Sequence, residues 1–185
     1  KLSAGTTLAA GLVIILLTGL IGAASNTHFD GVLDMHSGVK TPLWVYIAEG
    51  YLNFLVTAAS LTVLAVLFSK KSLRALPLYA GQAMARAPML LSAAAALLMN
   101  FETLSEQLAA NPSKAVKLIS EKPADLGIII ITALIGLAMI IWMVALMYKA
   151  YALNSPLPRG KRIITFIVGL IIAEIISKIV VVAMI

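Results

Sequence analysis

Residues 28–36 bring together side chains that could bind a metal ion. They read HFDGVLDMH and contain both histidines of the chain, His28 and His36, together with Asp30 and Asp34. Imidazole and carboxylate groups suit Zn²⁺ or Mn²⁺, and a helix beginning at Asp30 would place Asp34 on the same face. The spacing matches no standard metal-binding motif, so a capped turn, in which an aspartate accepts bonds from backbone amides, is the competing interpretation.

Ionisable residues inside long apolar runs form the second candidate site. A charged side chain near the centre of a membrane helix costs about 2.5–3.5 kcal/mol on insertion scales, so each one needs a partner or water. With a rise of about 1.5 Å per residue, Arg86 and Glu174 fall near mid-membrane, and Lys178 shares a helix face with Glu174. We predict a neutral intramembrane cluster with two hydrogen-bonding neighbours, made of Glu49, Arg86, Glu174, Lys178, Asn53 and Gln82.

Three interpretations of this intramembrane cluster are open. The simplest is that it fixes the register of neighbouring helices; the others are a functional polar cavity, and independent extension of each charged side chain to the membrane surface. If Arg86 pairs with Glu174, replacing Arg86 alone by leucine should destabilise the fold. Replacing both residues by leucine should then partly restore it.

The composition requires a membrane around these residues. Of 185 residues, 61% are hydrophobic and only 12% are charged, and the mean hydropathy is +1.01. A soluble domain has about a quarter of its residues charged, so this chain could not cover an apolar interior with a polar surface. In a membrane protein, basic residues chiefly set the orientation of the chain in the bilayer. The net charge of +6 is therefore explained without a nucleic-acid partner. The absence of cysteine excludes disulfides, thiolate metal sites and cysteine catalysis.

The apolar runs predict an all-α polytopic membrane protein with five transmembrane helices in a single domain, residues 1–185. A span needs about 20 mainly apolar residues, and five segments qualify: 8–24, 43–68, 76–99, 126–148 and 163–185. The third is the weakest, because Gln82, Arg86 and Pro88 fall inside it. An amphipathic segment at 101–122 is expected to lie on the outer membrane surface.

The distribution of basic residues predicts the orientation. Two connections are rich in lysine and arginine, with Lys70, Lys71 and Arg74 in one and Lys149, Arg159, Lys161 and Arg162 in the other. Because cytoplasmic loops carry this excess, both connections and the N-terminus are expected inside, and the C-terminus outside. If segment 76–99 only lay on the surface, the two basic connections would fall on opposite sides of the membrane.

Catalytic motifs are absent from the sequence. It contains no GxSxG, HExxH, GxGxxG or phosphate-binding loop, and no histidine lies in a predicted span where it could activate a serine. We therefore expect a protein that is not an enzyme. No cofactor is expected beyond a divalent metal, Zn²⁺ or Mn²⁺, at the residues of the HFDGVLDMH segment.

Several segments together resemble the Yip1 family of five-span integral membrane proteins, in particular its bacterial branch. They are HFDGVLDMH followed by residues 40–44 (KTPLW), residues 82–88 (QAMARAP) and residues 142–150 (WMVALMYKA). The likeness covers nearly the whole chain, although its motifs are mostly apolar. It implies a five-helix bundle with no established enzymatic chemistry and no catalytic residues. Eukaryotic members are linked to vesicle traffic and Rab GTPases, which bacteria lack, so that role does not transfer.

Two functions follow as expectations. The first is a non-enzymatic protein of the bacterial inner membrane, acting as a scaffold, a lipid-organising element or a partner subunit, with the lipid bilayer and another membrane protein or a second copy as partners. The alternative is a small proton or divalent-cation transporter or channel, with residues 28–36 as the uptake site and the intramembrane cluster as a relay. A water-accessible path from His28 and His36 to Glu49 and Glu174 would indicate transport, whereas a dry cluster would indicate a scaffold.

Overall fold

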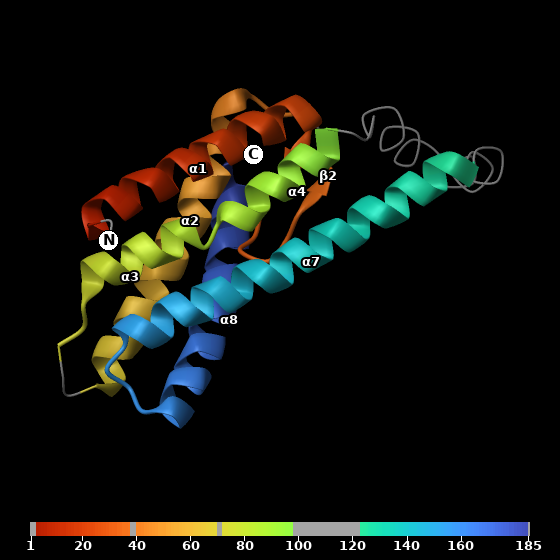
Figure 1. The fold of residues 1–185 in the computed structure, drawn as a ribbon. Coiled ribbons are helices and arrows are strands. Elements are labelled where there is room, and N and C mark those ends of the chain that lie inside the picture. Colours follow the sequence, from red (N-terminus) through yellow and green to blue (C-terminus); the bar gives the residue numbers. More distant parts are fainter. Residues whose placement is uncertain (1–2, 38–39, 70–71, 98–122, 185) are drawn as a thin grey trace.

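The computed structural model describes residues 3–37, 40–69, 72–97 and 123–184, and in these ranges the chain is almost entirely helical (Figure 1). Two helices, α3 and α4, are short, and the only strands in the described ranges are two residues long. In chain order the elements are α1 (Ala4–Ser25), β1 (Thr27–His28), β2 (His36–Ser37), α2 (Leu43–Phe68), α3 (Ala75–Met84), α4 (Ala87–Leu97), α7 (Pro123–Asn154) and α8 (Arg159–Met184).

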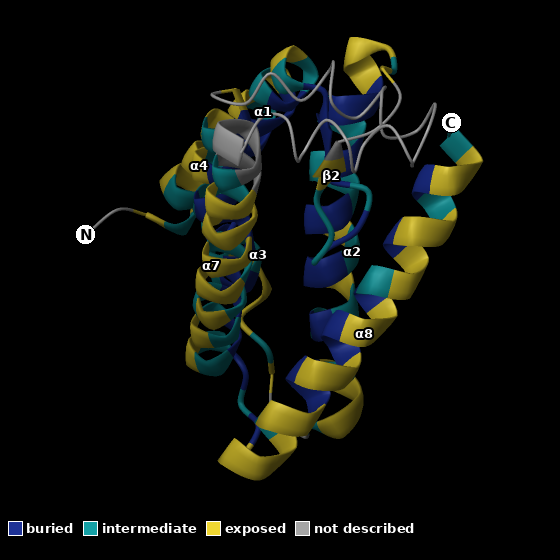
Figure 2. Cartoon of the chain, turned by 90° about the vertical axis from the view of Figure 1, so that its right-hand side faces the viewer, coloured by how far each residue is buried: buried dark blue, intermediate teal, exposed yellow. Residues whose placement is uncertain are grey.

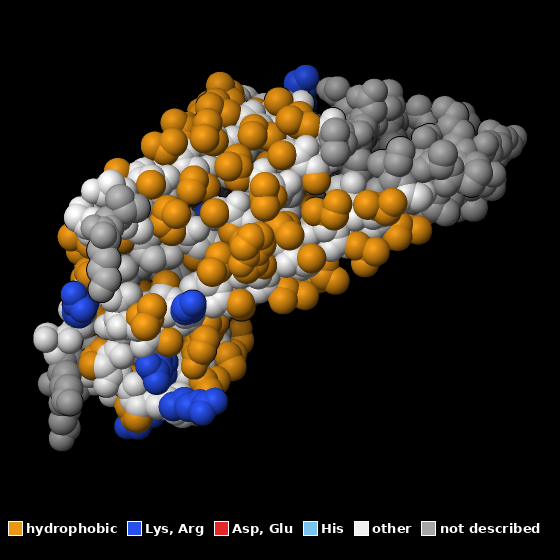
Figure 3. Space-filling view, viewed as in Figure 1, with side chains coloured by type: hydrophobic (Ala, Val, Ile, Leu, Met, Phe, Trp, Pro, Cys, Tyr) orange, Lys and Arg blue, Asp and Glu red, His pale blue; other side chains and the backbone are white. Residues whose placement is uncertain are grey.

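Four helices are long and apolar enough to cross a membrane: α1, α2, α8 and residues 130–154 of α7. Their outward faces carry large apolar side chains, with Val182 78%, Leu153 74% and Leu67 70% exposed. Figure 3 shows such side chains spread over one face of the bundle, while lysine and arginine side chains gather mainly at one end. Exposing so large an apolar surface to water would be energetically unfavourable, so the chain is a membrane-embedded, multi-pass protein.

The predicted third span, 76–99, is divided into two helices. Residue Ala85 ends α3 and Arg86 lies at the break before α4. Pro88 explains the break, because proline has no N–H to donate and its ring clashes with the carbonyl four residues earlier, here that of Met84. Neither half reaches the length of a span alone. Residues 98 and 99 lie outside the described ranges, as does the predicted amphipathic segment 101–122.

The helices form two packed groups, which meet where α1 lies against α2. In the first group α1 and α7 both lie against α3 and α4, and in the second α8 packs along α2. Figure 2 shows the buried faces of α2 and α8 turned toward each other. On α8 that face contains the small residues Gly169, Ala173 and Ser177 at steps of four, all buried. Small residues at this spacing let helices approach closely in lipid, and these three lie where α8 packs on α2.

Gly11 marks a close approach of α1 to α3. A Cβ atom there would lie 2.5 Å from Ala83 Cβ and 2.7 Å from the Ala83 carbonyl carbon. Because backbone cannot move aside as a side chain can, we expect Gly11→Leu to lower the free energy of unfolding by about 1–3 kcal/mol through overpacking. Gly5→Leu on the same helix is the matched control, since its Cβ would meet only Ser3 Oγ at 3.8 Å. Unfolding in mixed micelles measures both, and equal stability of the two variants would contradict the close approach.

Candidate functional site

The connection between α1 and α2 folds back into the helix bundle. Asn26 ends α1 in the left-handed conformation, φ 50°, and its N–H donates to the Gly22 carbonyl, a helix ending that asparagine tolerates well. Strands β1 and β2 then pair antiparallel, with His28 opposite His36. We call residues 26–37 the α1–α2 loop. Its apolar residue Val32 is 2% exposed, so the middle of the loop belongs to the protein interior.

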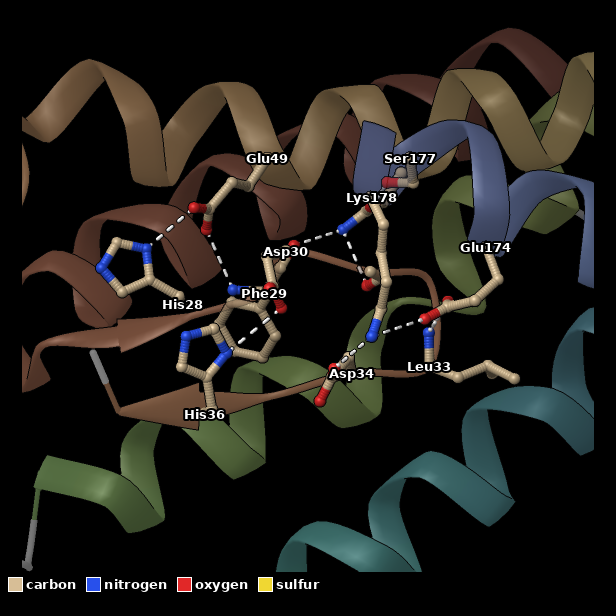
Figure 4. Close-up of polar contacts among 12 residues, drawn as sticks. His28, Phe29, Asp30, Leu33, Asp34, His36, Glu49, Glu174, Ser177 and Lys178 are labelled. Carbon is tan, nitrogen blue, oxygen red and sulfur yellow. Dashed lines mark hydrogen bonds and ion pairs between the residues drawn. The ribbon is translucent and has the colours of Figure 1, made fainter. Parts of the chain in front are cut away.

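Glu49 of α2 binds the first part of the α1–α2 loop. Its side chain is fully buried, and its two oxygens accept hydrogen bonds from the Phe29 backbone N–H at 2.9 Å and from His28 Nδ1 at 2.8 Å (Figure 4). The His28 ring also stacks on Tyr46, with ring centroids 4.3 Å apart. A buried carboxylate is expensive unless it is hydrogen-bonded, and here the loop supplies both donors.

Asn53, one turn further along α2, binds the next part of the loop. Its side-chain amide donates to the carbonyl oxygens of Phe29 and Gly31, and its side-chain oxygen accepts from the Ser177 hydroxyl of α8. A Cβ atom on Gly31 would collide with the Glu174 carboxylate, so a larger residue here would displace that side chain. Asn53 therefore joins α2, α8 and the loop.

Arg86 lies at the break between α3 and α4, where its guanidinium reaches the same loop. It donates to the carbonyl oxygens of Val32 at 3.3 Å and Asn53 at 2.9 Å, and to the Thr57 hydroxyl at 3.0 Å. The side chain is buried. The break in the helix, which follows from Pro88, thus places a cation in the interior with neutral oxygens around it.

Glu174 and Lys178 of α8 bind the last part of the loop. Glu174 Oε2 accepts from the Leu33 N–H at 2.8 Å, and Lys178 Nζ donates to Asp34 Oδ2 at 2.7 Å. Lys178 Nζ also lies 3.6 Å from Glu174 Oε1, one helical turn away. Helix α8 is thereby connected to the loop by a backbone bond and an ion pair.

The six predicted cluster residues are now placed. Glu49, Asn53, Arg86, Glu174 and Lys178 all bind the α1–α2 loop, whereas Gln82 donates to the Met147 carbonyl at 2.9 Å and joins α3 to α7. The expected ion pair between Arg86 and Glu174 is not formed; of the described members of the cluster, only Glu174 and Lys178 lie within ion-pair distance of each other. Sequence reasoning missed the loop as their shared partner, together with Thr57 and Ser177. The apolar residues of the loop, such as Val32 and Leu33, were the available signal that it is buried.

The four predicted metal ligands separate into two groups. Asp30, Asp34 and His36 converge, with one potential ligand atom from each lying within 4.8 Å of the others. His28 is not part of this group, because its ring is bound to Glu49 in the interior. His36 Nδ1 lies 3.2 Å from Asp30 Oδ1. The α1–α2 loop thus has an interior side fixed by helices and an outer side with three candidate ligands.

A small cavity borders the interior side of the loop. It has a volume of about 20 Å³ and is lined in part by Gly31, Asn53, Arg86 and Met89. A space of this size holds about one water molecule.

The ion pair between Lys178 and Asp34 predicts a pH effect. The hydrogen bond from Lys178 holds the pKa of Asp34 below its usual 3.8, although partial burial opposes this. Since the folded-state pKa is the lower one, the ionised carboxylate contributes stability above pH 3.8, and this contribution is lost as the pH falls through the folded-state pKa. We expect wild type to be more stable than Asp34→Asn at neutral pH, with the difference shrinking in acid. Unfolding measured for both proteins across this range is the check, and a constant difference would contradict the assignment.

Comparison with known proteins gives no relative: no family model, no curated protein and no solved structure matches the chain. The class of protein is therefore defined by its own architecture. It is a multi-pass helical membrane protein whose intramembrane polar side chains bind the loop between its first two helices.

Proposed function

We propose that the chain is a non-enzymatic, five-span integral membrane protein of the bacterial inner membrane, of the kind found in the Yip1 family, that acts as a scaffold or partner subunit. One observation carries the proposal. The hydrogen bonds of Glu49, Asn53, Arg86 and Glu174 are used to fix the α1–α2 loop. Polar groups that hold a loop rigid favour a structural role.

The contacts of Glu49 argue against the alternative role as a proton or cation transporter. A relay residue must exchange partners with water or with the transported ion. Glu49 is fully buried and both of its oxygens are occupied, by His28 and by the Phe29 amide. The adjacent cavity has room for about one water molecule. The two occupied oxygens of Glu49 support a fixed structural role for this residue.

Transport is tested directly in proteoliposomes. We expect proton and Zn²⁺ fluxes no greater than in protein-free liposomes, and no change on Glu49→Gln or Glu174→Gln. Flux that requires the purified protein and is lost in either variant would replace the scaffold proposal by the transporter.

The arrangement of helices supports a five-pass topology with the N-terminus inside and the C-terminus outside. In Figure 1 successive elements run in alternating directions, with α3 and α4 together making one pass, and residues 72–74 and 155–158 lie at the same end of the bundle. The basic residues of both connections would then face the cytoplasm, as the positive-inside rule requires.

The absence of cysteine allows this topology to be tested by single-cysteine labelling. Gly160→Cys places a thiol in open space beside the basic connection, and Lys40→Cys places one on the outer side of α2. A membrane-impermeant maleimide should label Lys40→Cys in intact cells and label Gly160→Cys only after permeabilisation. The reverse pattern would invert the topology, and labelling of both in intact cells would remove the five-pass arrangement.

A scaffold must also have a partner. Extraction with its native lipids into polymer nanodiscs, followed by native mass spectrometry, should give a defined complex with another membrane protein or with a second copy. A photo-crosslinking residue at Val182, 78% exposed on α8, should mark that contact. A protein that is found only as a monomer in lipid, with crosslinks to lipid alone, would contradict the scaffold role.

A further inference from the structure

The outer side of the α1–α2 loop carries a group of side chains that the scaffold role does not use. Asp30, Asp34 and His36 each offer one ligand atom, and these atoms lie within 4.8 Å of one another. We propose that these three side chains bind a divalent transition metal, with Zn²⁺ as the best fit. The site is distinct from the interior contacts of the loop and does not depend on the scaffold proposal.

The Asp30 carboxylate is placed so that it could share a cation with His36. Asp30 Oδ1 is buried, and it accepts no hydrogen bond from the described part of the protein. Its neighbour at 3.2 Å is His36 Nδ1, a nitrogen that can serve as a metal ligand. His36 Nδ1 is therefore the ion-pair contact of this oxygen, and a metal ion bound by both side chains would replace that contact with two coordinate bonds.

The charge around the group also favours a divalent cation. Asp34 and Glu174 share Lys178, which lies 2.7 Å from one and 3.6 Å from the other. Asp30 adds a third carboxylate beside them. Lys178 lies within ion-pair distance of Asp34 and Glu174, while the ion-pair partner of Asp30 among the described residues is His36. With His36 neutral, three carboxylates then face one lysine, and this negative charge favours a divalent cation.

The donor set selects the metal. One imidazole and two carboxylates, without a thiolate, fit Zn²⁺ with three protein ligands and a position left for water. In a tetrahedral site with ligand atoms about 2.0–2.2 Å from Zn²⁺, those atoms lie about 3.4 Å apart, so the group must contract by up to about 1.4 Å. The His36 side chain is 48% exposed and the Asp30 side chain 26% exposed, so side-chain rotation of both residues can supply this change.

Lys178 competes with the metal for Asp34. Its ammonium group occupies Asp34 Oδ2 at 2.7 Å, so a metal ion that binds this carboxylate must displace it. Lys178 can then remain beside Glu174, which is already 3.6 Å away. This arrangement predicts opposite effects for the two partners of one ion pair: loss of Asp34 should weaken metal binding, and loss of Lys178 should strengthen it.

The experiment is isothermal titration of the full chain in detergent micelles with ZnCl₂. Wild type should bind one Zn²⁺, and Asp34→Asn and His36→Ala should each weaken binding by at least about 10-fold. Lys178→Met should tighten binding by about 2- to 5-fold, the competition expected of an exposed ion pair. Lys161→Met, which removes the same charge from an exposed site at the other end of α8, is the matched control and should bind as wild type does.

Asp34→Asn is expected to weaken Zn²⁺ binding and Lys178→Met to tighten it. The test therefore stays informative even where a variant folds poorly, because misfolding cannot tighten binding. Absence of binding by wild type would overturn the proposal. Equal affinity in wild type, Asp34→Asn and His36→Ala would place the ion elsewhere and also overturn it. An unchanged or weaker affinity for Lys178→Met would contradict the competition, and tighter binding of Mn²⁺ than of Zn²⁺ would overturn the choice of metal.

Discussion

Arg86→Leu is expected to lower the free energy of unfolding by about 3–5 kcal/mol. The substitution removes the donors to the Val32 carbonyl, the Asn53 carbonyl and the Thr57 hydroxyl. Two of these oxygens lie on α2 and the third lies on the α1–α2 loop, so the loss affects both structures at once. The Asn53 carbonyl still accepts from the Thr57 hydroxyl, so the main losses are at the Val32 carbonyl and the Thr57 hydroxyl. Each buried acceptor left without a donor costs about 1–3 kcal/mol, and the apolar surface of leucine offsets part of the sum.

Equilibrium unfolding in mixed micelles measures this effect. Arg74→Leu is the matched control, because Arg74 is exposed at the start of α3 and its replacement should change stability by no more than about 0.5 kcal/mol. Similar losses from Arg86→Leu and Arg74→Leu would show that the buried guanidinium does not hold the loop.

The double variant separates two accounts of Arg86. The ion pair expected from sequence predicts that Glu174→Leu partly rescues Arg86→Leu. The observed contacts predict a further loss, because Glu174 accepts the Leu33 N–H at 2.8 Å and its removal leaves that donor unpaired. A double-mutant cycle measures the coupling, and recovery of stability in the double variant would restore the ion-pair account.

Glu49→Leu is expected to have the second large effect, a loss of about 2–4 kcal/mol. It removes the carboxylate that accepts from the Phe29 N–H and that His28 Nδ1 contacts in the interior. Glu49→Gln should cost less than about 1.5 kcal/mol, because its carbonyl oxygen can accept from Phe29 and its amide can face the other tautomer of His28. A stable Glu49→Gln beside a destabilised Glu49→Leu would identify hydrogen bonding, and not ionisation, as the requirement.

Hydrogen exchange provides the local measurement. In wild type the Phe29 amide should exchange slowly, since it is bonded to a fully buried carboxylate. Glu49→Leu should accelerate that exchange and leave amides in the middle of α7 unchanged. Equal acceleration throughout the helices would mean global destabilisation without a specific role for Glu49 in the loop.

The sequence by itself determined the long helices and the residues that need partners. Predicted span 43–68 coincides with α2, and the predictions at 8–24, 126–148 and 163–185 fall on α1, α7 and α8 within a few residues, apart from the longer ends of α7. The long helices and the need of the charged residues for partners both have a local cause. Apolar length decides whether a helix can lie in lipid, and a charge such as Arg86 or Glu174 in an apolar run is costly wherever the run packs.

Only the tertiary structure decided which partners those residues have. Glu174 binds an amide 141 residues away in the chain, at Leu33, and Arg86 binds backbone oxygens where sequence reasoning expected a carboxylate. Residue types reveal opposite charges, but every residue carries backbone donors and acceptors, so the sequence does not mark the ones that will be buried. The fold brought the α1–α2 loop to the ionisable residues, because α2, α8 and the break between α3 and α4 all face that loop. The same packing drew His28 inward to Glu49 and left Asp30, Asp34 and His36 together on the outer side.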